Sequence, residues 1–327
     1  MGLFALCTLL YAARWIFFYS SAIRILGHRT MCMFLGAIPM GLITIVNGFL
    51  VFGIPRWGDA AVRIAANLWW ADAMMALACA WFVPYLMFTR QEHELKNMTA
   101  VWLLPIVAAE VTAASGGLIA PHLGTTLEAR DMLFFSYTLW ATSVLPAMGI
   151  LVILFLRMVL HKLPGKDMAV SSWLALGPLG TGTLGLLTLG TAAQQVLPGV
   201  DTAIAGAAYG FGVIGGVILW GYGLWWLVLA VLTTLAHLPT GLPFNMGWWG
   251  FTFPLGVYSV ATLKLAGLTG IGFYNIMGGV FVVMLLAFWL MVTLHTLPGI
   301  YHGYLFRAPC LSYETGMRDA QAAAQQA

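Results

Sequence analysis

The chain has 327 residues, of which 61% are hydrophobic and only 8% are charged. A soluble domain has roughly 25% charged residues, so this composition excludes a soluble enzyme, a nucleic-acid-binding domain and a disordered chain. The formal net charge of +3 is too small to indicate an acidic polymer as a partner. Glycine and tryptophan are plentiful, as in membrane proteins. We therefore predict an all-α polytopic membrane protein in a lipid bilayer.

The first 27 residues can be interpreted in two ways. A single span would place Arg14 near its centre, where a lone Arg costs several kcal/mol. We prefer an apolar half-span that ends near Ala13, followed by an interfacial connector from Arg14 to Arg29. This interpretation implies that the chain begins inside a helix, with a preceding segment missing.

Eight further segments are long and apolar enough to span a bilayer, which takes about 20 residues. With the partial first helix, they make about nine spans. The eight predicted spans are 30–53, 64–89, 98–120, 132–156, 169–191, 202–235, 246–268 and 273–299.

Lysine and arginine are distributed unevenly between the two ends of these spans. The richer side is predicted to be cytoplasmic, and the C-terminus lies on that side. Residues 1–306 are predicted to form one transmembrane domain, and 307–327 a disordered cytoplasmic tail. The richer side holds Arg14, Arg24, Arg29, Arg90, Lys96, Arg157, Lys162, Lys166, Arg307 and Arg318, and the other holds Arg56, Arg63, Arg130 and Lys264.

Alternate spans carry a proline near the middle, and three of the four continue as Pro-x-Gly. Proline removes a backbone donor and kinks a helix. Kinks that recur once per helical hairpin predict a ring of hairpins, with the kinked helices inside around a central pore. The alternative is ordinary kinking that improves packing. The residues concerned are Pro39, Gly41, Pro105, Pro178, Gly180, Pro254 and Gly256.

Two carboxyl groups fall inside spans, where ionisable residues indicate function. Glu110 lies about one helical turn beyond Pro105, close to the expected axis. It could exchange a proton with a transported anion, or it could accept a structural hydrogen bond between helices. Asp72 lies on a span without a central proline, beside two tryptophans, and we favour a structural role for it.

Residues that could bind a cofactor or metal are scattered. Only His295 among the histidines lies inside a span, whereas haem ligation between helices needs facing mid-span histidines. The four cysteines form no Cys-x-x-Cys pair. We predict no cofactor, no metal site and no enzymatic activity.

Aromatic residues gather just before the last kink, in the segment Pro243–Ser259. Trp248 and Trp249 are typical of an interfacial belt. Phe253 lies deeper, directly before Pro254, where an apolar side chain on the axis can close a pore by excluding water.

Four segments resemble the tellurite-resistance/dicarboxylate transporter family, and more closely its malate permease and sulfite efflux branch, which is related to the plant slow anion channel. The resemblance covers nearly the whole chain, except that the first family helix and the start of the second are absent. The segments are MFLGAIPMGLITIVN (Met33–Asn47), WLLPIVAAEVTAASGG (Trp102–Gly117), WLALGPLGTG (Trp173–Gly182) and PFNMGWWGFTFPLGVYS (Pro243–Ser259).

This resemblance implies ten helices in five hairpins, with the odd-numbered helices around the pore, usually in a trimer. It also implies a phenylalanine on the ninth helix that blocks the anion path. The matching residue here is Phe253, with Phe251 as the alternative.

Together, the residues and the resemblance predict transport of a small anion, either a C4-dicarboxylate such as malate or sulfite, across the plasma (inner) membrane by a homotrimer. A mid-span lining without Lys or Arg would bind the anion weakly and release it quickly. One alternative is a passive channel for chloride or nitrate. Another is a membrane-embedded enzyme or redox protein. Nucleic acid is not an expected partner.

Overall fold

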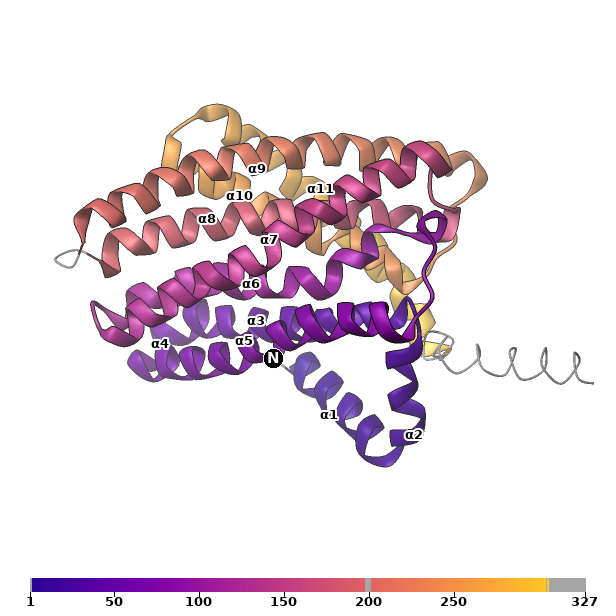
Figure 1. The fold of residues 1–327 in the computed structure, drawn as a ribbon, viewed down its shortest axis with the longest axis horizontal. Coiled ribbons are helices and arrows are strands. Elements are labelled where there is room, and N and C mark those ends of the chain that lie inside the picture. Colours follow the sequence, from indigo (N-terminus) through magenta and orange to yellow (C-terminus); the bar gives the residue numbers. More distant parts are fainter. Residues whose placement is uncertain (1, 198–200, 304, 306–327) are drawn as a thin grey trace, which may run out of the picture.

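The computed structural model describes residues 2–197, 201–303 and 305. These residues form an all-helical molecule whose long helices run side by side (Figure 1). The predicted tail, 307–327, lies outside the described residues. The α-helices are α1 Gly2–Phe17, α2 Tyr19–Ala22, α3 Ala37–Gly48, α4 Ile54–Trp57, α5 Asp59–Arg90, α6 Leu104–Ile119, α7 Leu127–His161, α8 Leu176–Val196, α9 Thr202–His237, α10 Phe253–Thr269 and α11 Gly272–Tyr301.

Shorter helical segments connect or extend these helices. A π-helical segment, η3 Phe49–Gly53, follows α3. The 3-10 segments are η1 Ile23–Gly27, η2 Met31–Gly36, η4 Leu95–Asn97, η5 Ala100–Leu103, η6 Ala120–Leu123, η7 Lys166–Ala175, η8 Leu238–Thr240 and η9 Met246–Phe251.

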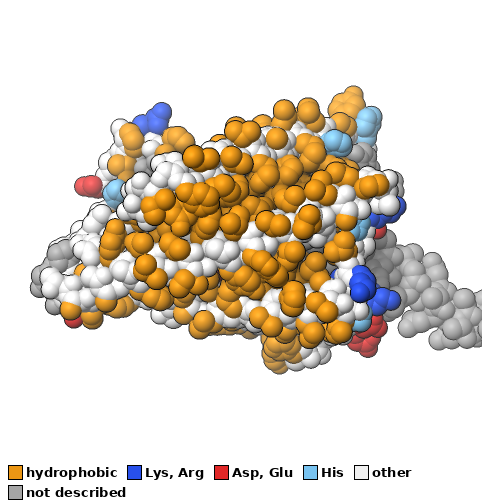
Figure 2. Space-filling model, turned by 90° about the horizontal axis from the view of Figure 1, so that it is seen from above, with side chains coloured by type: hydrophobic (Ala, Val, Ile, Leu, Met, Phe, Trp, Pro, Cys, Tyr) orange, Lys and Arg blue, Asp and Glu red, His pale blue; other side chains and the backbone are white. Residues whose placement is uncertain are grey.

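All eight full spans predicted from the sequence are confirmed as helices long and apolar enough to cross a membrane. Hydrophobic side chains cover the body of the molecule in Figure 2, and charged side chains gather at its two ends. This distribution matches a lipid-covered belt between two aqueous surfaces. The spans are Met31–Trp57, Asp59–Arg90, Ala100–Leu123, Leu127–His161, Lys166–Val196, Thr202–Thr240, Met246–Thr269 and Gly272–Tyr301.

The N-terminal segment differs in detail from the prediction. Helix α1 continues through Arg14 to Phe17, one turn beyond the predicted end near Ala13. The chain then bends by 107° into the helical segment Tyr19–Gly27. Figure 1 shows α1 and α2 as an arm that stands out from the other helices. None of the α1 residues is fully buried, so this helix has few contacts to fix its position.

His28 fixes the start of the next span. Its Nδ1 atom accepts hydrogen bonds from the backbone N–H groups of Thr30 (3.2 Å) and Met31 (3.1 Å). Burial lowers the pKa of the His28 imidazole, which favours the neutral form that this acceptor role requires. The imidazole thereby satisfies donors that the beginning of a helix leaves unpaired.

Helices α6 and α8 form the centre of the bundle. In the spans that contain them, 89% of the most apolar stretch is buried, against 50% for the span of α10, 33% for those of α3, α5, α7 and α9, and 17% for that of α11. Helix α3 packs on α6, α6 on α8, and α8 on α10. Each of these inner helices also packs on the outer helix that follows it, so the predicted hairpins are confirmed.

The four predicted proline kinks are transitions from a 3-10 helix to an α-helix. Segment η2 leads into α3, η5 into α6, η7 into α8 and η9 into α10. Pro39, Pro105, Pro178 and Pro254 each lie within the first turn of their α-helix. The first turn is where proline is tolerated, because its missing N–H would have no intrahelical partner there.

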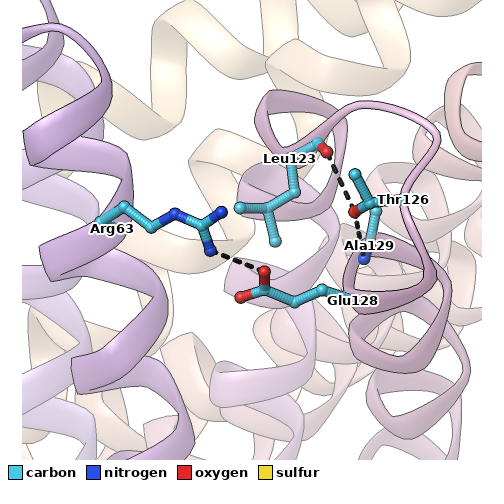
Figure 3. A network of polar contacts seen from close by, with 5 residues as sticks. All are labelled: Arg63, Leu123, Thr126, Glu128 and Ala129. Atoms are coloured by element: carbon cyan, nitrogen blue, oxygen red, sulfur yellow. Dashed lines mark hydrogen bonds and ion pairs between the residues drawn. The ribbon is translucent and has the colours of Figure 1, made fainter.

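The turn between α6 and α7 lies at the end of the bundle that has fewer basic residues. Thr126 caps α7, because its Oγ1 atom accepts a hydrogen bond from the Ala129 backbone (3.1 Å; Figure 3). Beside it, Arg63 of α5 forms an ion pair with Glu128 of α7 (2.6 Å). Both side chains are solvent-accessible, so this pair contributes little to stability.

Glycine allows α8 and α10 to approach closely. A Cβ atom on Gly180 would lie 2.9 Å from the backbone nitrogen of Tyr258 and 3.0 Å from its Cα atom. Since backbone atoms cannot move aside as a side chain can, a larger residue at this position must separate the two helices.

We predict that Gly180→Ala destabilises the protein by about 1–3 kcal/mol, the usual cost of overpacking a well-packed core. Gly221→Ala, on α9, is the matched control because nothing lies within 4 Å of its added Cβ atom. Thermal unfolding in detergent should show a lower midpoint for the first variant only. Equal midpoints would contradict the close approach.

Candidate functional site

The 3-10-to-α transitions of neighbouring inner helices lie close together. A Cβ atom on Gly36, just before α3, would lie 2.7 Å from the Cα atom of Pro105 at the start of α6. A Cβ on Gly177 of α8 would lie 3.9 Å from Val107 of α6. Gly180 touches α10 near its own transition. The transitions of α3, α6 and α8 therefore lie close to one another, and α8 packs on the first turns of α10.

The three glycines of the Pro-x-Gly motifs face different neighbours. A Cβ on Gly41 would lie 3.4 Å from the ring of Phe4 in α1, and one on Gly256 would lie 3.6 Å from Leu285 in α11. Gly180 faces the α10 backbone. The four prolines themselves are buried. The motif thus brings several helices close together, and its place on a pore lining stays a prediction.

Glu110 lies between the two central helices. It is fully buried on α6, and its Oε1 atom accepts a hydrogen bond from the Thr181 hydroxyl of α8. On the same stretch of α6, the Ile106 carbonyl accepts a hydrogen bond from Ser143 of α7 (2.8 Å). The second carboxyl oxygen of Glu110 has no hydrogen-bond partner among the described residues. The side chain is thus held on one oxygen only.

Asp72 connects the outer helix α5 to α6. Its Oδ2 atom accepts a hydrogen bond from the Thr112 hydroxyl (2.6 Å), and the indole of Trp69 donates to the Thr112 carbonyl (2.8 Å). As in Glu110, the other carboxyl oxygen, Oδ1, lacks a partner in the described part of the chain. This geometry fits the structural role that the sequence favoured for Asp72.

Neither buried carboxyl group has an ion-pair partner within the described residues; the pair that the structure records there is Arg63–Glu128. An ionised carboxylate in an apolar interior is costly without a nearby cation. The described residues therefore supply no cation that would compensate a charge on either carboxyl group.

The two candidate gate residues occupy different environments. Phe251 is 2% exposed, and its ring lies 4.7 Å from that of Phe288 and 5.3 Å from that of Trp173 (centroid distances). Phe253, the first residue of α10, is only partly buried and packs against the larger core cluster formed around α6. The Phe251 ring thus lies in an aromatic cluster toward α11, whereas the Phe253 ring packs against a different cluster and is partly accessible.

Sequence reasoning missed the threonines that hold the buried carboxyl groups. Thr181 follows Pro178 on α8, and Thr112 follows Glu110 on α6. The signal that could have identified them is a hydroxyl residue inside an otherwise apolar span, since such groups form hydrogen bonds between membrane helices. Among the described residues, no three His, Cys, Asp or Glu side chains are arranged to hold a metal ion.

In the described part of the chain, eight helices are long and apolar enough to cross a membrane, and four of them change from 3-10 to α-helix, which defines a polytopic membrane protein of the kind that includes transporters and channels. Over residues 1–297 the sequence matches the SLAC1 family, described as voltage-dependent anion channel. The chain belongs to this family, which confirms the resemblance to the related anion transporters.

Similar proteins carry transporter names. A sulfite efflux pump of Arthroderma otae is 42% identical over 271 residues, which cover 82% of this chain and 71% of the relative. An uncharacterized transporter of Methanocaldococcus jannaschii is 26% identical over 306 residues, covering 93% and 84%. A malic acid transport protein of Schizosaccharomyces pombe is 21% identical over 286 residues, covering 81% and 61%. The family and these names indicate transporters and channels rather than enzymes.

We predict that Thr181→Val lowers stability by about 1 kcal/mol, a usual value for a hydrogen bond between membrane helices. Valine keeps the shape but leaves the Glu110 carboxyl without its donor. Thr138→Val on α7 is the control, because that hydroxyl is exposed and bonds only within its own helix. Thermal unfolding in detergent measures both variants, and an equal effect would argue against the interhelical bond.

Proposed function

We propose that this protein moves small anions across the membrane along an axis between the starts of the inner helices. One observation carries the proposal: the start of α6 lies beside the starts of α3 and α8, and α8 packs in turn on the first turns of α10. The beginning of an α-helix has a partial positive charge, which favours anions. Broken helices build transporter sites from such ends.

The names of the relatives guide the choice of substrate. The relative with 42% identity is named a sulfite efflux pump, whereas the malic acid transport protein is only 21% identical. Sulfite is therefore the first substrate to test, and a C4-dicarboxylate such as malate the second. A passive channel for chloride or nitrate is the second candidate function, supported by the family description.

Further features of the assembled protein belong to this proposal. The protein acts in the plasma (inner) membrane as a homotrimer, with the lysine- and arginine-rich end of the bundle in the cytoplasm. Residues 91–99 and 162–165 lie at that end and are joined there through Arg157, which donates to the carbonyls of Lys96 (2.7 Å) and Lys162 (2.7 Å). The C-terminus lies on the same side.

Phe253 closes the anion path in the resting protein. We predict that Phe253→Ala raises anion flux several-fold in proteoliposomes, because it removes an apolar ring from the axis. Phe251→Ala is the matched control: its ring packs against Trp173 and Phe288, so truncation should lower stability by about 3–5 kcal/mol without raising flux. If the folded Phe253→Ala variant has the same anion flux as the wild type, the assignment of Phe253 as the gate is wrong.

Glu110 couples anion movement to protons. We predict that Glu110→Gln still moves anions but loses its response to an imposed pH gradient, because glutamine keeps an acceptor oxygen for Thr181 and cannot ionise. The measurement compares uptake of sulfite, malate, nitrate and chloride into proteoliposomes with and without the gradient. If the Glu110→Gln variant still responds to the pH gradient, the role of Glu110 is structural and a passive anion channel becomes the favoured function.

A further inference from the structure

The chain that leads into the span of α3 meets the loop after α5 at the lysine- and arginine-rich end of the bundle. The Gln91 side chain joins them, because its Nε2 atom donates to the Leu26 carbonyl (2.9 Å) and to the Cys32 sulfur (3.0 Å). The Cys32 side chain is fully buried. We call this contact the Gln91 junction.

His93 extends the Gln91 junction to a second inner span. Its Nε2 atom lies 3.0 Å from Gln91 Oε1, and because an amide oxygen can only accept, Nε2 is the donor. The imidazole stands nearly perpendicular to the indole of Trp102, 5.1 Å away between ring centroids. Trp102 lies in η5, which leads into α6, and Cys32 lies in η2, which leads into α3. The junction therefore connects the beginnings of two inner spans.

His28 holds the chain between Leu26 and Cys32 by accepting hydrogen bonds. Its Nδ1 atom accepts from the backbone N–H groups of Thr30 (3.2 Å) and Met31 (3.1 Å), and its carbonyl accepts from the Cys32 backbone N–H (3.2 Å). A protonated imidazole has an N–H donor at each nitrogen and cannot accept. Protonation of His28 therefore removes two hydrogen bonds and turns a third N–H toward the same two donors.

The surroundings keep the imidazoles of this region neutral. Burial lowers the pKa of both His28 and His93, and the positive charge of Arg29 lowers both further, although a backbone hydrogen bond raises that of His28. An ordinary imidazole has a pKa of about 6.5, so both rings are mainly neutral at about pH 7. The other titratable groups on the parts of the chain that meet here are Tyr19, Arg24, Cys32, Arg90, Glu92, Glu94 and Lys96.

The two carboxylates of the loop do not favour the charged form of these rings strongly. Glu92 and Glu94 are exposed, and water and salt screen exposed charges. Glu94 also accepts a hydrogen bond from Asn97 (3.0 Å) in its own loop.

We propose that His28 makes the Gln91 junction a pH-sensitive switch: acid at this end of the bundle protonates His28, opens residues 27–32 and frees the beginning of the span that contains α3. The switch is separate from the transport path and does not depend on which anion the protein moves. The open form binds a proton at His28 more readily than the closed form. The equilibrium therefore shifts toward the open form as the pH falls below about 6.5, by up to about tenfold per pH unit.

The test is hydrogen–deuterium exchange of the purified full chain in detergent, between about pH 8 and about pH 5, where histidine titrates. After correction for the intrinsic effect of pH on exchange, the Thr30 and Met31 N–H groups of the wild type should lose protection below about pH 6.5. The Ala129 N–H is the internal control, because its acceptor is the Thr126 hydroxyl, which does not titrate. If protection at Thr30 and Met31 stays constant relative to Ala129, the proposal is wrong.

Two variants separate His28 from general effects of acid. His28→Asn keeps a side-chain acceptor for the backbone N–H groups and does not titrate, so protection at Thr30 and Met31 should no longer change with pH. His122→Asn is the matched control, because His122 is an exposed histidine in η6, and it should keep the wild-type response. A His28→Asn variant that loses protection at the same pH as the wild type would overturn the proposal.

Cys32 gives a second measurement that does not rely on amide exchange. Cys32 is buried and bonded to Gln91, whereas Cys7 on α1 is exposed, so thiol labelling of Cys7 corrects for the effect of pH on thiol reactivity. The ratio of Cys32 to Cys7 labelling should rise in the wild type between about pH 7.5 and about pH 5.5 and stay constant in His28→Asn. A ratio that does not change in the wild type, or changes equally in both proteins, would contradict the switch.

Discussion

Every backbone donor and acceptor in a membrane interior needs a partner within the protein, and this constraint organises the inner helices. Each of the four carries a proline where a continuous α-helix would need an N–H group. The chain meets the constraint by running as a 3-10 helix up to that point and starting a new α-helix around the proline. The proline then lies in a first turn, where an α-helix has no intrahelical acceptor for the N–H group that proline lacks.

Close packing follows from these breaks. Gly36, Gly177 and Gly180 lie at or near them, and each faces a neighbouring inner helix. Small residues at these points let the backbones approach, as is common where membrane helices pack. Between α6 and α8, the Thr181 hydroxyl of α8 reaches the Glu110 carboxyl of α6.

Hydropathy was sufficient to predict the eight full spans, because a span is a local property of about 20 consecutive residues. The alternation of prolines separated the more buried spans of α6, α8 and α10 from the outer ones, but the span of α3 is only as buried as the outer spans. A proline by itself did not predict a change of helical type, because Pro84 and Pro146 lie inside the continuous α-helices α5 and α7. The α1 helix ends one turn later than predicted, because a single Arg14 near a helix end does not stop a helix.

The partners of the carboxyl groups could not be read from the sequence. Thr181 lies 71 residues from Glu110, and Thr112 lies 40 residues from Asp72. Such pairs depend on the rotation and depth of two packed helices, which hydropathy does not determine. For the same reason the sequence could not separate Phe251 from Phe253. They differ by two positions in the chain, yet their rings pack in different clusters.

The 3-10 segments also give the inner spans extra length. A 3-10 helix rises about 2.0 Å per residue and an α-helix about 1.5 Å, so the ten residues of η7 extend about 5 Å further than they would in an α-helix. Rewinding η7 would draw its loop inward by that distance and turn successive side chains by about 20° per residue, since the two helices have 3.0 and 3.6 residues per turn. A change between the two helical types in η7 would therefore alter the length of its inner span by several ångströms.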